Sequence, residues 1–180
     1  MSDVKNEDVE PDIFDELKNV RIKHPNKFQC AYLNINSFRN KFQLIKELLN
    51  ENIVDMIIVG EIKLDETFRN GEFPVDNFHL WRADQTANGG GLLVYIRSDL
   101  ACMRKNKLEC EHIESIFTEI SFKDKKWLIC GLYRPPSLCD NIFVEDFIKT
   151  FDNISTKYDN IIIIGDLNYN YLHDEKCTPL

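Results

Sequence analysis

The sequence predicts an α/β fold on the basis of two observations. Apolar runs of strand length recur along the chain, and four of them end at a small set of polar residues: the runs 28–33, 56–60, 127–132 and 161–165. Amphipathic segments of helix length lie between them, at 38–50 and 141–155. Unbroken apolar runs are typical of strands that are buried on both faces, and helices that join such strands pack on the sheet.

Composition and charge limit the possible functions. The chain has 180 residues, of which 43% are hydrophobic, enough for one well-buried core and too few to argue for two. The net charge of −8 argues against broad nonspecific adhesion to nucleic acid, which depends on many Lys and Arg contacts to phosphate. A nuclease with an acidic metal site and a few local cations remains compatible with this charge.

The six cysteines show neither a Cys-x-x-Cys pair nor a regular spacing, and several lie inside apolar runs. We interpret them as buried free thiols in a reducing compartment. No apolar stretch reaches the length of a membrane span, and the N-terminus is acidic. We therefore expect an intracellular protein, nuclear or cytoplasmic, without a membrane partner.

Residues 1–26 form a charged N-terminal extension, and residues 27–180 form the domain that follows it. Apolar residues between Ile13 and Ile22 predict a short amphipathic helix, which Pro25 ends. The extension is interpreted as lying outside the core. A frayed leader, a docked helix and a partner-binding segment remain open alternatives.

The first part of the domain predicts a β-loop-α-β unit. A strand at 28–33 is followed by a helix at about 38–50, and a second strand occupies 55–60. Ser37 is placed to cap the helix. Four residues have the spacing of one buried helical face: Phe38, Phe42, Ile45 and Leu49.

The second part of the domain is richer in strands. A polar stretch at 63–77 predicts a surface loop, and four closely spaced strands follow it: 78–82, 91–96, 115–122 and 127–133. Lys123 to Lys125 predict a tight hairpin turn between the last two strands. A second helix, at about 141–155, leads to a strand at 160–164.

Glu61 and Asp166 each follow a buried strand directly. If those strands lie side by side and parallel, both carboxylates emerge at the same edge of one sheet. Two carboxylates with open positions around them fit Mg²⁺ or Mn²⁺, because Mg²⁺ prefers few protein ligands together with water and phosphate oxygens. An acidic residue after a strand is also a common turn former or helix cap, and this alternative stays open for each residue alone.

Two carboxamides accompany these strand ends. Asn168 lies two residues after Asp166, so both side chains can project toward one pocket. An amide can hold a phosphate oxygen while a carboxylate orients or deprotonates a water molecule. Asn34 and Asn36 repeat this arrangement after the first strand, where an Asx turn is the alternative.

Tyr133 and Arg134 begin a loop that two prolines make rigid. A phenol and a guanidinium both donate hydrogen bonds to phosphate, and a rigid loop lowers the entropy lost in positioning them. A proline-rich turn with a surface arginine is the structural alternative.

Gly89 to Gly91 have the composition of a phosphate-cradling loop, but they lead into a strand pattern instead of a helix. A nucleotide-binding loop needs the N-terminus of the helix that follows it, so we reject that interpretation. Arg82 and Arg97 flank this segment. Two interpretations of them stay open: they supply local positive charge to a site, or they are solvated surface residues.

Four strings at the strand ends together resemble the endonuclease/exonuclease/phosphatase superfamily: LNINS from Leu33, GE from Gly60, LYRPP from Leu132 and GDLN from Gly165. With GGGLLVYIR, they are similar to the apurinic-type endonuclease domain of non-LTR retrotransposons. The resemblance, from about Phe28 to Asn168, implies a four-layered α/β sandwich of two sheets flanked by helices. It also implies metal-dependent cleavage of a DNA phosphodiester by in-line attack of water, leaving a 3′-hydroxyl.

The resemblance implies a role for each residue at the strand ends. Glu61 binds the divalent metal, Mg²⁺ or Mn²⁺, and Asn34 and Asn168 hold the scissile phosphate. Tyr133 donates a hydrogen bond to a phosphate oxygen, and Asp166 orients the nucleophile. A further contact to the phosphate is expected from the guanidinium that follows Tyr133.

The sequence departs from the family pattern at two places. Asn36 stands where many relatives have an aspartate near the metal. Relatives also continue beyond the GDLN string with further strands and a terminal Ser-Asp-His-like string, whereas this chain stops at Leu180. We expect a fold without those strands and a rate lower by roughly two to four orders of magnitude. An uncovered apolar sheet face would favour self-association or loose packing.

Three functions remain open from the sequence. The first is a metal-dependent DNA endonuclease domain from a retrotransposon-type polyprotein, impaired by truncation. The second is a remnant of a mobile element without turnover. The third is a superfamily phosphatase that acts on a phosphoester outside nucleic acid.

Overall fold

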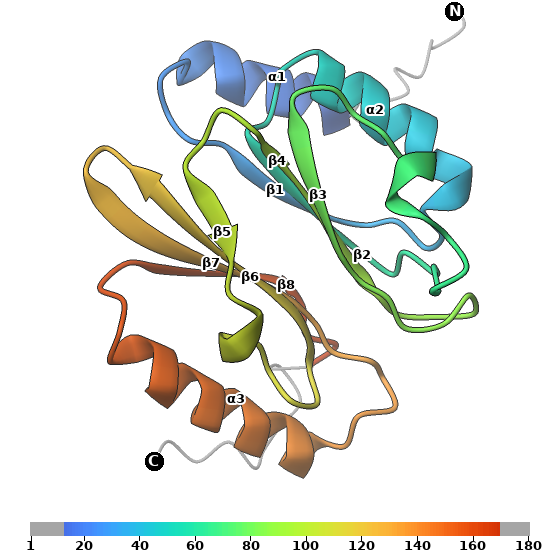
Figure 1. Ribbon diagram of the computed structural model, residues 1–180, viewed down its shortest axis with the longest axis vertical. Helices are drawn as coiled ribbons and strands as arrows, with labels where there is room; N and C mark the ends of the chain where they lie inside the picture. The colour runs from blue at the N-terminus through green and yellow to red at the C-terminus, as the bar shows by residue number, and fades with distance from the viewer. Residues whose placement is uncertain (1–12, 170–180) are drawn as a thin grey trace, which may run out of the picture.

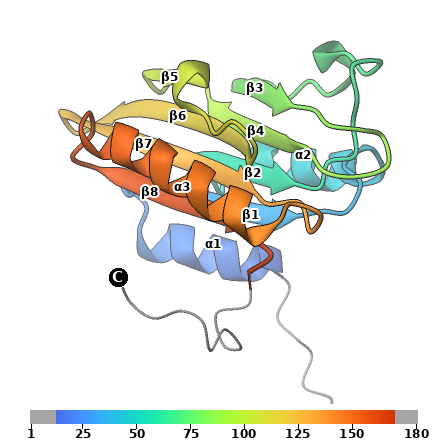
Figure 2. The ribbon, with the colours of Figure 1, turned by 90° about the horizontal axis from the view of Figure 1, so that it is seen from below.

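The apolar runs form two four-stranded sheets that pack face to face. In the computed structural model, which describes residues 13–169, helices α1 (Ile13–Lys23) and α2 (Phe42–Asn50) cover the outer face of one sheet, and α3 (Asp140–Ser155) covers the outer face of the other (Figure 1). Figure 2 shows α3 lying along the outer face of its sheet. The predicted four-layered α/β arrangement is confirmed.

The first sheet has the strand order β1-β2-β4-β3. Its strands are β1 (Cys30–Asn34), β2 (Met56–Gly60), β3 (Phe78–Ala83) and β4 (Leu92–Arg97). β1 and β2 are parallel, as expected for strands joined through a helix, and the other neighbours are antiparallel.

The second sheet has the order β5-β6-β7-β8. Its strands are β5 (Cys102–Arg104), β6 (Glu114–Phe122), β7 (Lys125–Tyr133) and β8 (Ile161–Asp166). β6 and β7 form the predicted hairpin, and their turn residues Lys123 and Asp124 both have positive φ, as a two-residue turn requires. α3 makes the crossover from β7 to the parallel strand β8.

Three apolar contact layers hold the sandwich together. β2 contributes to two of them, because Ile57 and Val59 face the layer under α2 while Met56 and Ile58 face the other sheet. This two-sided burial explains why the run has no polar alternation. The third layer packs β6 and β7 against α3, whose Phe143 is 5% exposed.

Helix α1 packs against the first sheet. Phe14 and Leu17 lie against the same apolar layer as α2. A guanidinium nitrogen of Arg21 lies 2.7 Å from a carboxylate oxygen of the buried Asp55, and Arg21 Nε donates to the carbonyl of Ile53. Of the alternatives for residues 1–26, the docked helix describes residues 13–23, which pack against the core from outside with partly buried side chains.

Two local expectations also differ from the structure. Ser37 does not cap the helix: its backbone has a φ of +94°, and a 3₁₀ turn at Arg39–Lys41 precedes α2, which begins without a side-chain cap. β5 is absent from the sequence prediction, because a strand of three residues is too short to show a period.

β1 and β8 are edge strands of their sheets and lie against one another across the sandwich. Ile163 of β8 is 45% exposed. Within residues 13–169, no helix has the length and apolar character needed to cross a membrane. The five cysteines in this part of the chain are free thiols, of which Cys130 is buried and Cys139 is exposed.

Candidate active site

Four side chains from four strand ends are joined by hydrogen bonds. The amide nitrogen of Asn34 lies 2.8 Å from Glu61 Oε1 and 3.2 Å from Asp166 Oδ2. The hydroxyl of Tyr133 donates to the same Glu61 oxygen at 3.2 Å. The structure therefore brings these four predicted residues together, and we call them the polar cluster.

The two carboxylates of the polar cluster come from different sheets. β2, which precedes Glu61, lies between β1 and β4 in the first sheet, and β8, which ends at Asp166, pairs with β7 in the second. The condition for both to emerge at one sheet edge, that β2 and β8 lie side by side and parallel, is not met, because the α3 crossover returns the chain to the sheet of β7. The carboxylates meet across the interface between the sheets, where Asn34 bridges them.

The loops around the polar cluster have unusual backbone conformations. Five non-glycine residues near it have left-handed φ angles: Asn36 (+46°), Ser37 (+94°), Glu61 (+54°), Lys63 (+52°) and Asn168 (+44°). Such conformations persist where the surrounding structure imposes them, and they concentrate at functional sites. Here the N–H of Ser37 donates to the carbonyl of Glu61 at 2.9 Å, which fixes one loop against the other.

The phenols at the site are buried. Tyr133 is 4% exposed, and burial together with the neighbouring Glu61 carboxylate raises its pKa to about 12, so it stays protonated as a donor. The hydroxyl of Tyr32 is also buried and finds no hydrogen-bond partner among the described residues. Gly60 makes room for it, since a Cβ there would lie 2.1 Å from that hydroxyl. Tyr32 lies inside an apolar run, so nothing in the sequence distinguishes it from a core residue.

Asn168 and Asn36 flank the polar cluster. The N–H of Asn168 donates to Asp166 Oδ1 at 3.0 Å, and its amide nitrogen lies 2.7 Å from the carbonyl oxygen of Arg134. Asn168 therefore orients Asp166 and ties the end of β8 to the loop after β7. Asn36 lies exposed on the loop after β1, and its roles toward a metal or phosphate stay predictions.

Arg134 has a different environment from the one predicted. It is 5% exposed, donates to the carbonyl of Leu138 at 2.7 Å, and forms an ion pair with Asp140 at the start of α3. Its guanidinium carbon lies 4.7 Å from the ring centroid of Phe143 and 5.6 Å from that of Tyr169. These contacts attach the loop to α3, and they do not favour a contact with phosphate.

The donors of the polar cluster fit a magnesium or manganese ion. Glu61 and Asp166 offer carboxylate oxygens, the ligands that these hard cations prefer. Within residues 13–169, no group of three or more His, Cys, Asp or Glu side chains is arranged to hold a metal. A site with two carboxylates agrees with the preference of Mg²⁺ for few protein ligands and several waters.

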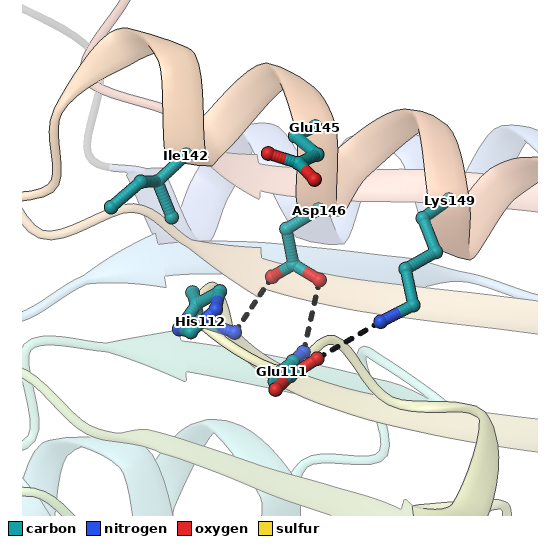
Figure 3. Close-up of a pocket in the computed structure, with 6 residues that line it drawn as sticks. All are labelled: Glu111, His112, Ile142, Glu145, Asp146 and Lys149. Atoms are coloured by element: carbon teal, nitrogen blue, oxygen red, sulfur yellow. Dashed lines mark hydrogen bonds and ion pairs between the residues drawn. The ribbon is translucent and has the colours of Figure 1, made fainter.

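Apart from the polar cluster, a polar hollow of about 110 Å³ lies between α3 and the loop before β6 (Figure 3). The carboxylate of Asp146 points into this loop and accepts hydrogen bonds from the N–H groups of Glu111, His112 and Ile113 at 2.7–3.1 Å. Lys149 pairs with Glu111 at the rim. Since the backbone already satisfies Asp146, this hollow is a structural link between α3 and the sheet.

Comparisons with solved structures show the same fold. The chain is similar to a 3′–5′ exonuclease from Neisseria meningitidis, with 15% identity, a TM-score of 0.59, and coverage of 78% of this chain and 58% of that one. It is also similar to the endonuclease domain of TRAS1, a telomere-specific non-LTR retrotransposon, with 13% identity, a TM-score of 0.58, and coverage of 80% of this chain and 60% of that one. A third similar structure is an AP endonuclease from Archaeoglobus fulgidus, with 15% identity, a TM-score of 0.52, and coverage of 79% of this chain and 58% of that one.

These values mean that the chain spans 58–60% of the length of the three structures. Comparison with curated protein sequences gave no match. A family model described as Endonuclease/Exonuclease/phosphatase family matches residues 31–180, which include every residue of the polar cluster. The chain therefore belongs to the Endonuclease/Exonuclease/phosphatase family.

Proposed function

We propose that this chain is a divalent-metal-dependent DNA phosphodiesterase of the endonuclease type found in non-LTR retrotransposons. The observation that carries the proposal is the convergence of two carboxylates, a carboxamide and a buried phenol across the sheet interface. The likeness to an exonuclease, a retrotransposon endonuclease domain and an AP endonuclease supports a DNA substrate.

In this proposal Glu61 and Asp166 hold Mg²⁺ or Mn²⁺, and Asp166 also orients the attacking water. The bound metal supplies positive charge that stabilises the developing charge on the phosphate. When substrate binds, Tyr133 turns its single phenolic hydrogen from Glu61 Oε1 to a phosphate oxygen. Asn34 keeps the two carboxylates at a fixed separation through its amide, and Asn168 holds Asp166 in place.

The four hydrogen-bonded side chains of the polar cluster include no histidine. A histidine is the side chain most often used to move protons near neutral pH, and general acid–base catalysis contributes typically about 10²–10⁴-fold. We therefore expect this chain to cut DNA slowly. Binding of DNA without turnover is the alternative that the same observation supports.

Nicking of supercoiled plasmid DNA tests the proposal. With Mg²⁺ present, the chain should convert supercoiled to open-circular DNA, and Glu61→Gln or Asp166→Asn should lower the rate by about 100-fold, since each removes a charged metal ligand. Glu119→Gln is a matched control, because Glu119 is a half-buried carboxylate of β6 that pairs with Lys105.

Nicking that is equal in all four proteins, or that persists in excess chelator, would reject the proposed metal-dependent reaction. Metal-dependent DNA binding without nicking, lost in both site variants, would select the alternative without turnover.

A further inference from the structure

Glu114 is a buried carboxyl group beside the polar cluster. It begins β6, is 8% exposed, and lies opposite Tyr133 in the β6–β7 pairing. Its Oε2 accepts a hydrogen bond of 2.5 Å from the N–H of Gly91, which leads into β4 of the other sheet. This single contact therefore links the two sheets at the end where the polar cluster lies.

The turn that Glu114 contacts admits only glycine. Gly90 and Gly91 have φ angles of +73° and +87°, where side chains are strained. A Cβ on Gly90 would lie 2.5 Å from Glu114 Oε1, and a Cβ on Gly91 would lie 2.7 Å from Ile62 Cγ1. The glycine-rich string, which is not a nucleotide-binding loop, is required here because its backbone approaches two side chains closely.

The same turn holds the loop that carries Glu61. The carbonyl of Gly90 accepts a hydrogen bond from the N–H of Lys63 at 3.1 Å, and the carbonyl of Gly91 accepts one from Ile62 at 3.4 Å. Glu61 and Lys63 both have left-handed φ angles, so this loop needs contacts from outside to keep its conformation.

We propose that Glu114 is a positioning residue for Glu61: it fixes the Gly90–Gly91 turn, and the turn holds the loop of residues 61–63 in the conformation that presents Glu61 to the metal. This inference rests on the proposed function for its metal, but its contacts belong to the protein alone. Because Glu114 acts as a hydrogen-bond acceptor, glutamine in its place keeps the contact through its amide oxygen.

The test compares Glu114→Gln with Glu114→Met, which has a similar length but no comparable acceptor. Asp55→Asn is the control, since Asp55 is 5% exposed and precedes the same strand, β2, that Glu61 follows. Three quantities are measured: the affinity for Mn²⁺ alone by paramagnetic resonance, amide exchange at Lys63, and the melting temperature.

Glu114→Met should weaken Mn²⁺ binding by about 10- to 100-fold, as is typical when a residue that orients a metal ligand is removed. It should also speed exchange at the Lys63 amide by at least about tenfold, because the turn that accepts this hydrogen bond is released. Glu114→Gln should stay within about threefold of the native chain in both quantities. Asp55→Asn should lower the melting temperature and leave the Mn²⁺ affinity and the Lys63 amide exchange unchanged.

Equal Mn²⁺ affinity and Lys63 exchange in Glu114→Met and the native chain would overturn the inference, as would an equal loss in Glu114→Gln. If the Met variant does not fold, Glu114→Ala replaces it, since it removes the same acceptor with a smaller side chain and should give the same two losses. A native chain that binds no Mn²⁺ would reject the proposed function, while the Lys63 exchange would still decide whether Glu114 positions the loop.

Discussion

Tyr133 is almost closed off from solvent, and this burial decides which proton state it brings to the site. With a pKa raised to about 12 by burial and by the charge of Glu61, its phenol stays a hydrogen-bond donor throughout the physiological range. A neutral donor held next to a carboxylate is suited to a phosphate oxygen on which negative charge increases during the reaction.

Tyr133→Phe removes this donor and keeps the ring. We expect DNA nicking to fall by about 10²-fold, as when one preorganised donor to a developing charge is removed, while the affinity for Mn²⁺ changes little. Initial rates at saturating Mg²⁺, together with a Mn²⁺ titration, measure the two effects. A rate within about twofold of the native chain would exclude a transition-state role for the phenol.

Glu114 provides a prediction about stability and pH. Burial, together with the nearby Glu61, raises its pKa from the ordinary value of 4.5 to about 7. A carboxyl group with a raised pKa binds more protons in the folded state, so its contribution is full below pH 4.5 and is lost as the pH rises through about 7. The contribution is up to about 3 kcal/mol.

Glu114→Gln has no charge to bury, so its stability should not fall in this way. As the pH rises from 5 to 8, the unfolding free energy of the variant should therefore increase relative to that of the native chain. Urea unfolding of both proteins at these two pH values gives the difference in unfolding free energy. An identical pH dependence in the two proteins would show that Glu114 keeps its ordinary pKa.

Single residues also show where sequence reasoning succeeds at the site. Asn34, Glu61, Tyr133 and Asp166 were predictable because each directly follows or ends an apolar strand, so the sheets themselves carry them to one place, although β1 and β8 are only partly buried edge strands. Arg134 comes one residue later, and its contacts depend on α3, which the string around it does not encode.

Among the elements, α1 most clearly gains its stability from tertiary contacts. It has 11 residues, a length at which an isolated helix is marginal in water. Its Arg21 reaches Asp55, a buried carboxylate that also pairs with Arg97 and accepts the N–H of Gln29. The helix is thus attached to the start of β2.

Arg21→Ala should lower the unfolding free energy by about 2 kcal/mol, because Asp55 loses one of its two cationic partners inside the protein. Lys18→Ala is the control on the same helix: its ion pair with Glu51 is solvent-exposed and should contribute less than about 1 kcal/mol. Urea denaturation followed by circular dichroism measures both. Equal losses in the two variants would show that the Asp55 contact does not hold α1.

Element boundaries were predictable where local sequence features set them, and not where contacts with another element set them. The β6–β7 hairpin follows from its alternating residues and short turn, both local features. The start of α2 does not follow from local features, because the loop after β2 holds Ser37 in a left-handed conformation, in which it cannot cap the helix. The pairing of β8 with β7 also depends on contacts between distant segments.

For the whole molecule, the open sheet edges are the basis for a prediction about self-association. β8 pairs on one side with β7, and within the described part of the chain its other side has no strand partner. Its sequence contains four consecutive isoleucines, and Ile163 is 45% exposed. Long, apolar and uncharged edges favour association between chains.

We expect self-association that increases with concentration and that Ile163→Lys reduces, because a lysine on an edge strand opposes strand pairing. Ile22→Lys is the control, since Ile22 is 75% exposed on α1 and belongs to no strand. Analytical ultracentrifugation over a range of concentrations measures the effect. A monomeric native chain at every concentration would contradict the prediction.

The division of the polar cluster between two sheets has a consequence for distant substitutions. Away from these polar contacts, apolar packing sets how the sheets sit on one another, and it is tight: a Cβ on Gly131 would lie 2.9 Å from Ile58 Cγ2. Any sliding of one layer over the other therefore changes the gap between Glu61 and Asp166 directly. Under the proposed function, a methyl group buried in this interface, far from any polar atom, is therefore expected to lower the activity while the chain stays folded.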